Sequence, residues 1–204
     1  MDTTQDSDLR PPRSDRPAIL VILGIGMFAG GFVAGLGLIN AIFRLVDPSQ
    51  FAITLLANTP IDAGAGVSSA QYEQMSVMAD SLSAGAVWLI AGAEMFTALT
   101  IGLVTASFSY ALWRIVSGQP FHRTMRVAAI VAGCSIVFGT LLSQGLGGLG
   151  QMMAATELED ALGGAAVAGF EISPLPIVVG FGILALSYVF HAGTRMQRDT
   201  EGLI

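Results

Sequence analysis

Four long stretches of the chain are almost free of charge, and polar segments separate them. These stretches cover residues 18–43, 84–113, 127–150 and 174–194, and Glu94 is the one Asp, Glu, Lys or Arg residue within them. A helix needs about 20 apolar residues to cross the hydrocarbon core of a bilayer. The pattern therefore predicts an all-α fold, an integral membrane bundle of four helices.

The remaining segments divide into tails and loops around a single membrane domain. A secretory signal peptide is the alternative interpretation of the first stretch. The stretch is longer than the apolar region of such a peptide, so we expect it to be retained. The polar N-terminal segment, with Pro11 and Pro12, favours a disordered tail. The predicted organisation is a tail at 1–16, a four-span domain at 17–198 with outer loops at 46–83 and 151–172, and a tail at 199–204.

The arginines predict the orientation of the spans. Eight of the nine basic residues lie before the first span, between the second and third, or after the fourth, and Arg44 lies at the outer end of the first span. Cytoplasmic loops carry the excess of arginine and lysine. The opposite loops carry Asp47, Asp62, Glu73, Asp80, Glu157, Glu159, Asp160 and Glu171. Both termini are therefore expected in the cytoplasm.

The first outer loop carries two patterns that are typical of helix starts. The sequence DPSQ at 47–50 places an Asp cap before Pro and Gln, and predicts a short interfacial helix through Phe51, Leu55 and Leu56 to about Pro60.

The second pattern is SSAQ at 68–71, a capping box. Tyr72, Met75, Ala79 and Leu82 follow it at helical spacing. This pattern predicts that the second span begins as a helix well outside the membrane.

The stretch GLGGLG at 145–150 fits the glycine pattern of a dinucleotide-binding loop. That loop requires a strand, a tight turn and then the start of a helix. Here an uncharged, span-like run precedes Gly145, so helix packing is the better interpretation.

Small residues recur every four positions on three of the spans. Such stripes allow close approach of membrane helices. We expect them to pack one bundle together, and the alternative is that one stripe, on the first span, binds a partner helix. The stripes are Gly26, Gly30 and Ala34, with Gly31 and Gly35 beside them, then Ala98, Gly102 and Ala106, and then Ser135, Gly139, Ser143 and Gly147.

Glu94 is the main candidate for a functional side chain, since an ionisable group at membrane depth often marks a functional site. It lies on the same face as Ala98 and Gly102, near the outer boundary of its span. We group it with Arg44, Asn40 and Gln144 as a candidate polar cluster. It could pair with Arg44, contact interfacial water, or serve transport or sensing.

Composition excludes several classes of function. The chain of 204 residues is 53% hydrophobic and 12% charged, with a mean hydropathy of +0.69. The formal net charge of −6 argues against nucleic acid as a partner. Cys134 is the one cysteine, and no catalytic motif, metal-ligand cluster or cofactor-binding loop is found, so we expect no cofactor and no metal.

The loop between the second and third spans reads WRIVSGQPFHRTMRVAAIVAG. Its Gly118, Pro120 and Phe121 resemble the Gly-x-Pro-Phe turn of an uncharacterised bacterial membrane family, domain of unknown function 2975. In that family a polar capping residue and an Asn follow the Phe, whereas His122 and Met125 stand in this region here. The resemblance implies a small multi-pass protein of the bacterial inner membrane, without catalytic residues.

Taken together, these patterns predict a non-enzymatic accessory or signalling protein that acts through helix contacts in the bilayer, with a membrane-protein partner or as a homo-oligomer. The alternative is a small transporter or an immunity-type protein that handles a ligand near Glu94. A membrane enzyme ranks third, because paired acid and base groups and a nucleophile are missing.

Overall fold

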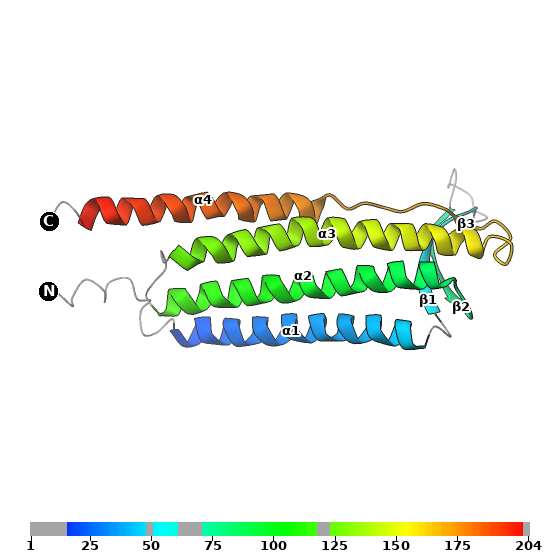
Figure 1. The fold of residues 1–204 in the computed structure, drawn as a ribbon, viewed down its shortest axis with the longest axis horizontal. Helices are drawn as coiled ribbons and strands as arrows, with labels where there is room; N and C mark the ends of the chain where they lie inside the picture. The colour runs from blue at the N-terminus through cyan, green and yellow to red at the C-terminus, as the bar shows by residue number, and fades with distance from the viewer. Residues whose placement is uncertain (1–15, 48–50, 61–70, 118–122, 202–204) are drawn as a thin grey trace, which may run out of the picture. The chain divides into compact units, whose positions relative to one another are not determined.

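The computed structural model describes residues 16–47, 51–60, 71–117 and 123–201. Within these residues, four helices and three strands follow one another along the chain, as Figure 1 shows. In order they are α1 (Arg16–Val46), β1 (Phe51–Pro60), β2 (Gln71–Ala79), α2 (Ala84–Val116), α3 (Arg123–Glu157), β3 (Ala166–Val167) and α4 (Leu175–Glu201).

Each stretch that the hydrophobic pattern selected forms a helix. Helices α1, α2 and α3 are long and apolar enough to cross a membrane. The apolar part of α4 that the structure describes is shorter, at Leu175–Tyr188. Pro174 and Pro176 stand at the start of α4, where a proline is tolerated because the first N–H groups of a helix have no partner within it.

The fold is mostly helical but not all-α, because the two segments predicted as outer loops contribute a small antiparallel sheet. Its strand order is β2-β1-β3. Strand β1 pairs with β2 in a register that sets Phe51 opposite Ala79, and its Leu56 and Ala57 pair with β3. The two longer strands form a hairpin, and the third comes from the second outer loop.

The prediction of two helices from the capping patterns is therefore wrong. Residues 51–60 form β1 instead of an interfacial helix, and residues 71–79 form β2 instead of the start of the second span. Helix α2 begins only at Ala84. Its cap is Ser83, whose Oγ accepts a hydrogen bond from the N–H of Ala86 at 3.3 Å.

Contacts divide the chain into two units, and α1, α2 and α3 contribute residues to both. The first unit comprises Met1–Leu36, Thr97–Leu141 and Ser173–Ile204, and the second comprises Gly37–Phe96 and Leu142–Ile172.

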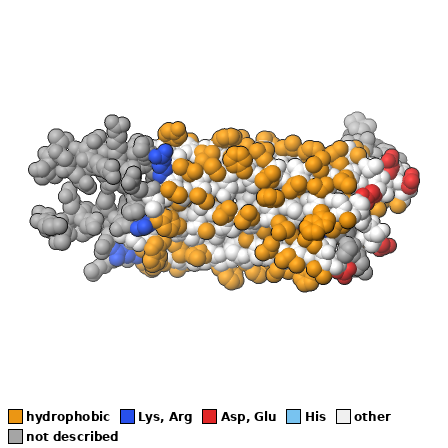
Figure 2. All heavy atoms as spheres, viewed as in Figure 1, with side chains coloured by type: hydrophobic (Ala, Val, Ile, Leu, Met, Phe, Trp, Pro, Cys, Tyr) orange, Lys and Arg blue, Asp and Glu red, His pale blue; other side chains and the backbone are white. Residues whose placement is uncertain are grey.

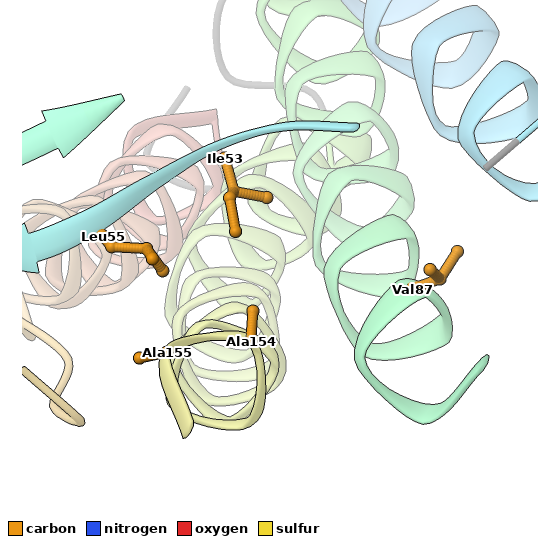
Figure 3. Close-up of a cluster of buried hydrophobic side chains, with 5 residues drawn as sticks. All are labelled: Ile53, Leu55, Val87, Ala154 and Ala155. Carbon is orange, nitrogen blue, oxygen red and sulfur yellow. The ribbon is translucent and has the colours of Figure 1, made fainter. Parts of the chain in front are cut away.

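The core of the second unit lies between the sheet and two helices. Ile53 and Leu55 of β1 point toward Ala154 of α3, and Val87 of α2 and Ala155 complete the cluster (Figure 3). Leu55 is only 1% exposed. Ile53 and Leu55 are two positions apart and so lie on the same face of β1. The alternation of the strand thus buries one face against the helices.

The first unit holds its helices at close range through small residues. A Cβ on Gly133 of α3 would lie 3.0 Å from the carbonyl oxygen of Gly180 on α4, and a Cβ on Gly180 would lie 3.1 Å from that of Gly133. Outside these contacts the helices carry many exposed apolar side chains (Figure 2). The most apolar window of α1 is 0% buried.

Candidate functional site

An ion pair in the second unit joins two of the residues that the sequence singled out. The Nε of Arg44 lies 3.0 Å from Oε1 of Glu94, and the two side chains are 26% and 29% exposed. Arg44 stands in the last turn of α1, where the helix dipole favours a cation. The pair connects the end of α1 to α2.

Arg44 also binds the sheet. Its Nη1 donates a hydrogen bond of 2.9 Å to the carbonyl oxygen of Ala52 in β1. This carbonyl lies near the start of β1, outside the residues that pair with β3. A single guanidinium group therefore holds α1, α2 and β1 together. Its planar fork of donors suits this multiple role.

The second carboxylate oxygen of Glu94 is in a different situation. Oε2 is buried, and no donor among the described residues lies within hydrogen-bond distance of it. A buried oxygen without a donor destabilises the fold. One oxygen of the carboxylate is thus paired with Arg44, and the other oxygen could accept a proton or a ligand.

The other two members of the predicted polar cluster do not complete this site. Asn40 is exposed on α1, one turn before Arg44, and Gln144 is half-buried on α3. Neither donates to Oε2 of Glu94. The structure therefore pairs Arg44 with Glu94, and Asn40 and Gln144 contribute no donor to Oε2.

The predicted stripes lie partly in helix contacts. A Cβ on Gly30 of α1 would collide with Thr105 of α2, and one on Gly102 would lie 4.0 Å from Cβ of Ala34. On α3, a Cβ on Gly139 would collide with Thr100, and one on Gly147 would lie 3.3 Å from Cβ of Ala93.

Several other members of the stripes lie differently. Ala98 is buried, and Ser135 and Ser143 are half-buried. Gly26 and Ala106 are both exposed, so the prediction of a packing contact fails at these two positions. Both lie beyond the close Gly30–Thr105 contact, toward the ends of their helices in the first unit.

A second glycine face of α1 is left open. A Cβ built on Gly31 or on Gly35 would meet no heavy atom within 4 Å. The spacing of these two residues is that of the GxxxG motif, which allows the backbone of another helix to approach closely. In the first unit, α1 therefore packs on α2 through one small-residue face and presents a second one outward.

The stretch GLGGLG lies inside α3, which runs unbroken from Arg123 to Glu157. It therefore has neither the strand nor the tight turn of a dinucleotide-binding loop. Gly148 leaves room for Phe170, and Gly150 faces Ile90, so these glycines belong to packing contacts of the second unit.

The sequence analysis missed a polar cluster where α2 ends and α3 begins. Tyr110 and Thr124 share a hydrogen bond of 2.5 Å between their hydroxyl groups, and Nε of Arg114 donates to the Tyr110 hydroxyl at 2.8 Å. Arg114 also lies 5.3 Å from the centre of the Tyr110 ring. The spacing of Tyr110 and Arg114, one helical turn apart, was the available signal.

The inner-loop motif of Gly118, Pro120 and Phe121 lies outside the described residues. Within them, no group of three or more His, Cys, Asp or Glu residues could hold a metal ion. Comparison with family models, curated proteins and solved structures gave no match. The resemblance to domain of unknown function 2975 stays a prediction from the inner loop and the span layout.

Proposed function

We propose that this chain is a four-span integral membrane protein with cytoplasmic termini, and that it acts as a non-enzymatic accessory or signalling protein through helix contacts. The length and apolar surface of α1, α2 and α3 support membrane insertion. The bacterial inner membrane is the location that the inner-loop resemblance implies.

The distribution of charge supports the orientation. The described arginines of the first unit lie at or near helix ends, and they include Arg16, Arg114 and Arg126. The second unit carries Asp80, Glu157, Glu159, Asp160 and Glu171. An excess of arginine favours the cytoplasmic side, so the first unit contains the cytoplasmic helix ends and the second contains the outer loops.

The open glycine face of α1 is the observation that carries the proposed function. A Cβ on Gly31 or Gly35 would meet open space, whereas Gly30 on another face of α1 lies against Thr105 of α2. Membrane helices associate by van der Waals packing and weak hydrogen bonds, which small residues make possible. The partner is therefore a transmembrane helix, from another membrane protein or from a second copy of this chain.

Co-purification from native membranes tests this proposal. Gly31→Leu and Gly35→Leu should each reduce the recovery of the partner by about tenfold, equivalent to ~1.4 kcal/mol. Gly182→Leu is the matched control, because Gly182 of α4 also has open space around it. A second copy would be detected by mixing two affinity tags. If the wild type and all three variants retain the same proteins, α1 is not the binding face.

The unpaired oxygen of Glu94 favours a second candidate, a small transporter or immunity-type protein that handles a ligand at this residue. Oε2 could accept a proton or a ligand donor while Oε1 stays with Arg44. This candidate ranks below the first, because Arg44 already contacts both Glu94 and Ala52. These contacts give Glu94 a sufficient structural role. Substrate-dependent flux in proteoliposomes that Glu94→Gln abolishes would favour it.

A further inference from the structure

A groove between α1 and α2 opens on the first unit, on the helix face that bears Gly26. Its volume is about 260 Å³. The lining is mostly apolar and includes Ile22, Leu23, Gly26, Val104, Phe108 and Leu112. Thr105 and Ser109 add two hydroxyl groups.

The groove lies one turn beyond a close contact between α1 and α2. Gly30 lies against Thr105, and Ala34 lies near Gly102, so the two helices run antiparallel. One turn toward the start of α1, Gly26 has no side chain and no heavy atom lies within 4 Å of its Cβ position. The missing side chain leaves a slot that runs toward the N-terminal end of α1.

Arg16 stands at that end of the slot. It lies seven residues before Leu23 and ten before Gly26, spacings that place all three on one face of the helix. At 1.5 Å per residue, Ile22 is roughly 9 Å further along α1. The Nε of Arg16 is buried, and no acceptor among the described residues lies within hydrogen-bond distance of it.

The charge of Arg16 has no counterion on the helices that form the groove. The parts of α1, α2 and α3 that belong to the first unit contain no Asp or Glu. Arg114, the other nearby cation on α2, donates its Nε to Tyr110. A half-buried arginine whose Nε donor is unused favours an oxyanion, and phosphate suits its guanidinium group well.

We infer that this groove binds an anionic phospholipid, with one acyl chain in the slot between α1 and α2 and the phosphate on Arg16. Along α1, the apolar slot and the cation follow one another as the tail and the headgroup do in a phospholipid. They lie about one headgroup length apart. The inference rests on the membrane insertion in the proposed function, but it does not require a partner helix, because Gly26 lines the groove and Gly31 does not.

Native mass spectrometry of the purified full chain tests the inference. The chain is titrated in mild detergent with phosphatidylglycerol, with phosphatidylcholine, and with glycerol phosphate as the soluble headgroup. The wild type should retain phosphatidylglycerol roughly five- to tenfold better than phosphatidylcholine. Glycerol phosphate should not displace the lipid, because it lacks the acyl chain.

Two variants separate the two parts of the site. Arg16→Gln should lower the retention of phosphatidylglycerol to that of phosphatidylcholine. Gly26→Leu should lower the retention of both lipids, and the open space around Gly26 admits the new side chain without a collision. Arg126→Gln and Gly182→Leu are the matched controls, and both should behave as the wild type.

Four outcomes would overturn the inference: equal retention of the two lipids by the wild type, equal losses from Arg16→Gln and Arg126→Gln, unaltered lipid retention by Gly26→Leu, or displacement by glycerol phosphate.

Failure of the proposed function has a different signature. A chain that carbonate extracts from membranes is not integral, whereas an integral chain with no preference for phosphatidylglycerol refutes the lipid site alone.

Discussion

The single residue Arg44 connects three elements. It pairs with Glu94 of α2 and donates to the carbonyl of Ala52 in β1. The approach of Arg44 and Glu94 could be expected from the sequence, because both lie near the outer boundary of their spans. The contact with Ala52 could not, because a helix was expected where β1 lies.

Because Arg44 makes two contacts, replacing Arg44 and replacing Glu94 should lower the stability of the protein by different amounts. Glu94→Gln should lower the stability by ~1–2 kcal/mol, because the remaining charge can still reach the interface. Arg44→Gln should lower it further, since the bond to Ala52 is lost too. The double variant should recover part of the sum of the two losses. Thermal unfolding of the four proteins in one detergent measures these differences.

Complementation of a deletion strain adds the functional side of this experiment, and Arg126→Gln serves as a charge-loss control. A Glu94→Gln protein that is as stable as the wild type but inactive would contradict the structural role and favour the transport candidate. If the protein is both stable and active, Glu94 is neither a structural partner nor a ligand site.

Among the elements, the helices could be predicted and the strands could not. Long uncharged stretches can form only helices in a bilayer, because every backbone group must find a partner there. The segment at 71–79 satisfies two periods at once: Met75 and Ala79 fit a helix, and Met75, Val77 and Ala79 fit a strand. Pairing with β1, a distant contact, decides between them.

The packing contacts of the small residues could likewise be predicted only in part. The stripes on α1, α2 and α3 could be read from four-residue spacing, but Gly133 and Gly180 fall outside any such stripe. Their role depends on how closely α3 and α4 approach, which the sequence of neither helix reveals.

The contact between Gly133 and Gly180 predicts that even a methyl group is harmful there. Gly133→Ala and Gly180→Ala should each destabilise the protein by about 1–3 kcal/mol, because the new Cβ meets a backbone carbonyl that cannot rotate away. Gly182→Ala, with open space on the same helix, should be neutral or stabilising by up to about 1 kcal/mol. Thermal unfolding in a single detergent compares the three, and equal midpoints would mean that α3 and α4 do not touch at these glycines.

For the whole molecule, the division into two units matches the distribution of charge. The acidic loops fall in the second unit, and the described arginines other than Arg44 fall in the first. This separation could be foreseen from the sequence, since the spans and their flanks were already visible there. The composition of the second unit, a sheet packed on helix ends, required the pairing of distant segments.

Single-cysteine labelling in a Cys134→Ser background tests the proposed orientation. Asp80→Cys and Glu159→Cys, both at exposed positions of the second unit, should react from outside with a membrane-impermeant maleimide. Ser117→Cys, exposed at the end of α2 in the first unit, should react only after permeabilisation. Labelling of Ser117→Cys in intact cells would reverse the orientation.

The sheet also imposes an order on the biogenesis of the protein. Strand β3 completes the sheet beside Leu56 and Ala57, but the ribosome makes it only after all of α2 and α3. At about 5–20 residues per second, the interval between residue 57 and residue 166 is roughly 5–20 s. Throughout that interval the edge of β1 that β3 will cover stays open to pairing with other newly made chains, so the sheet can close only after both helices have been made.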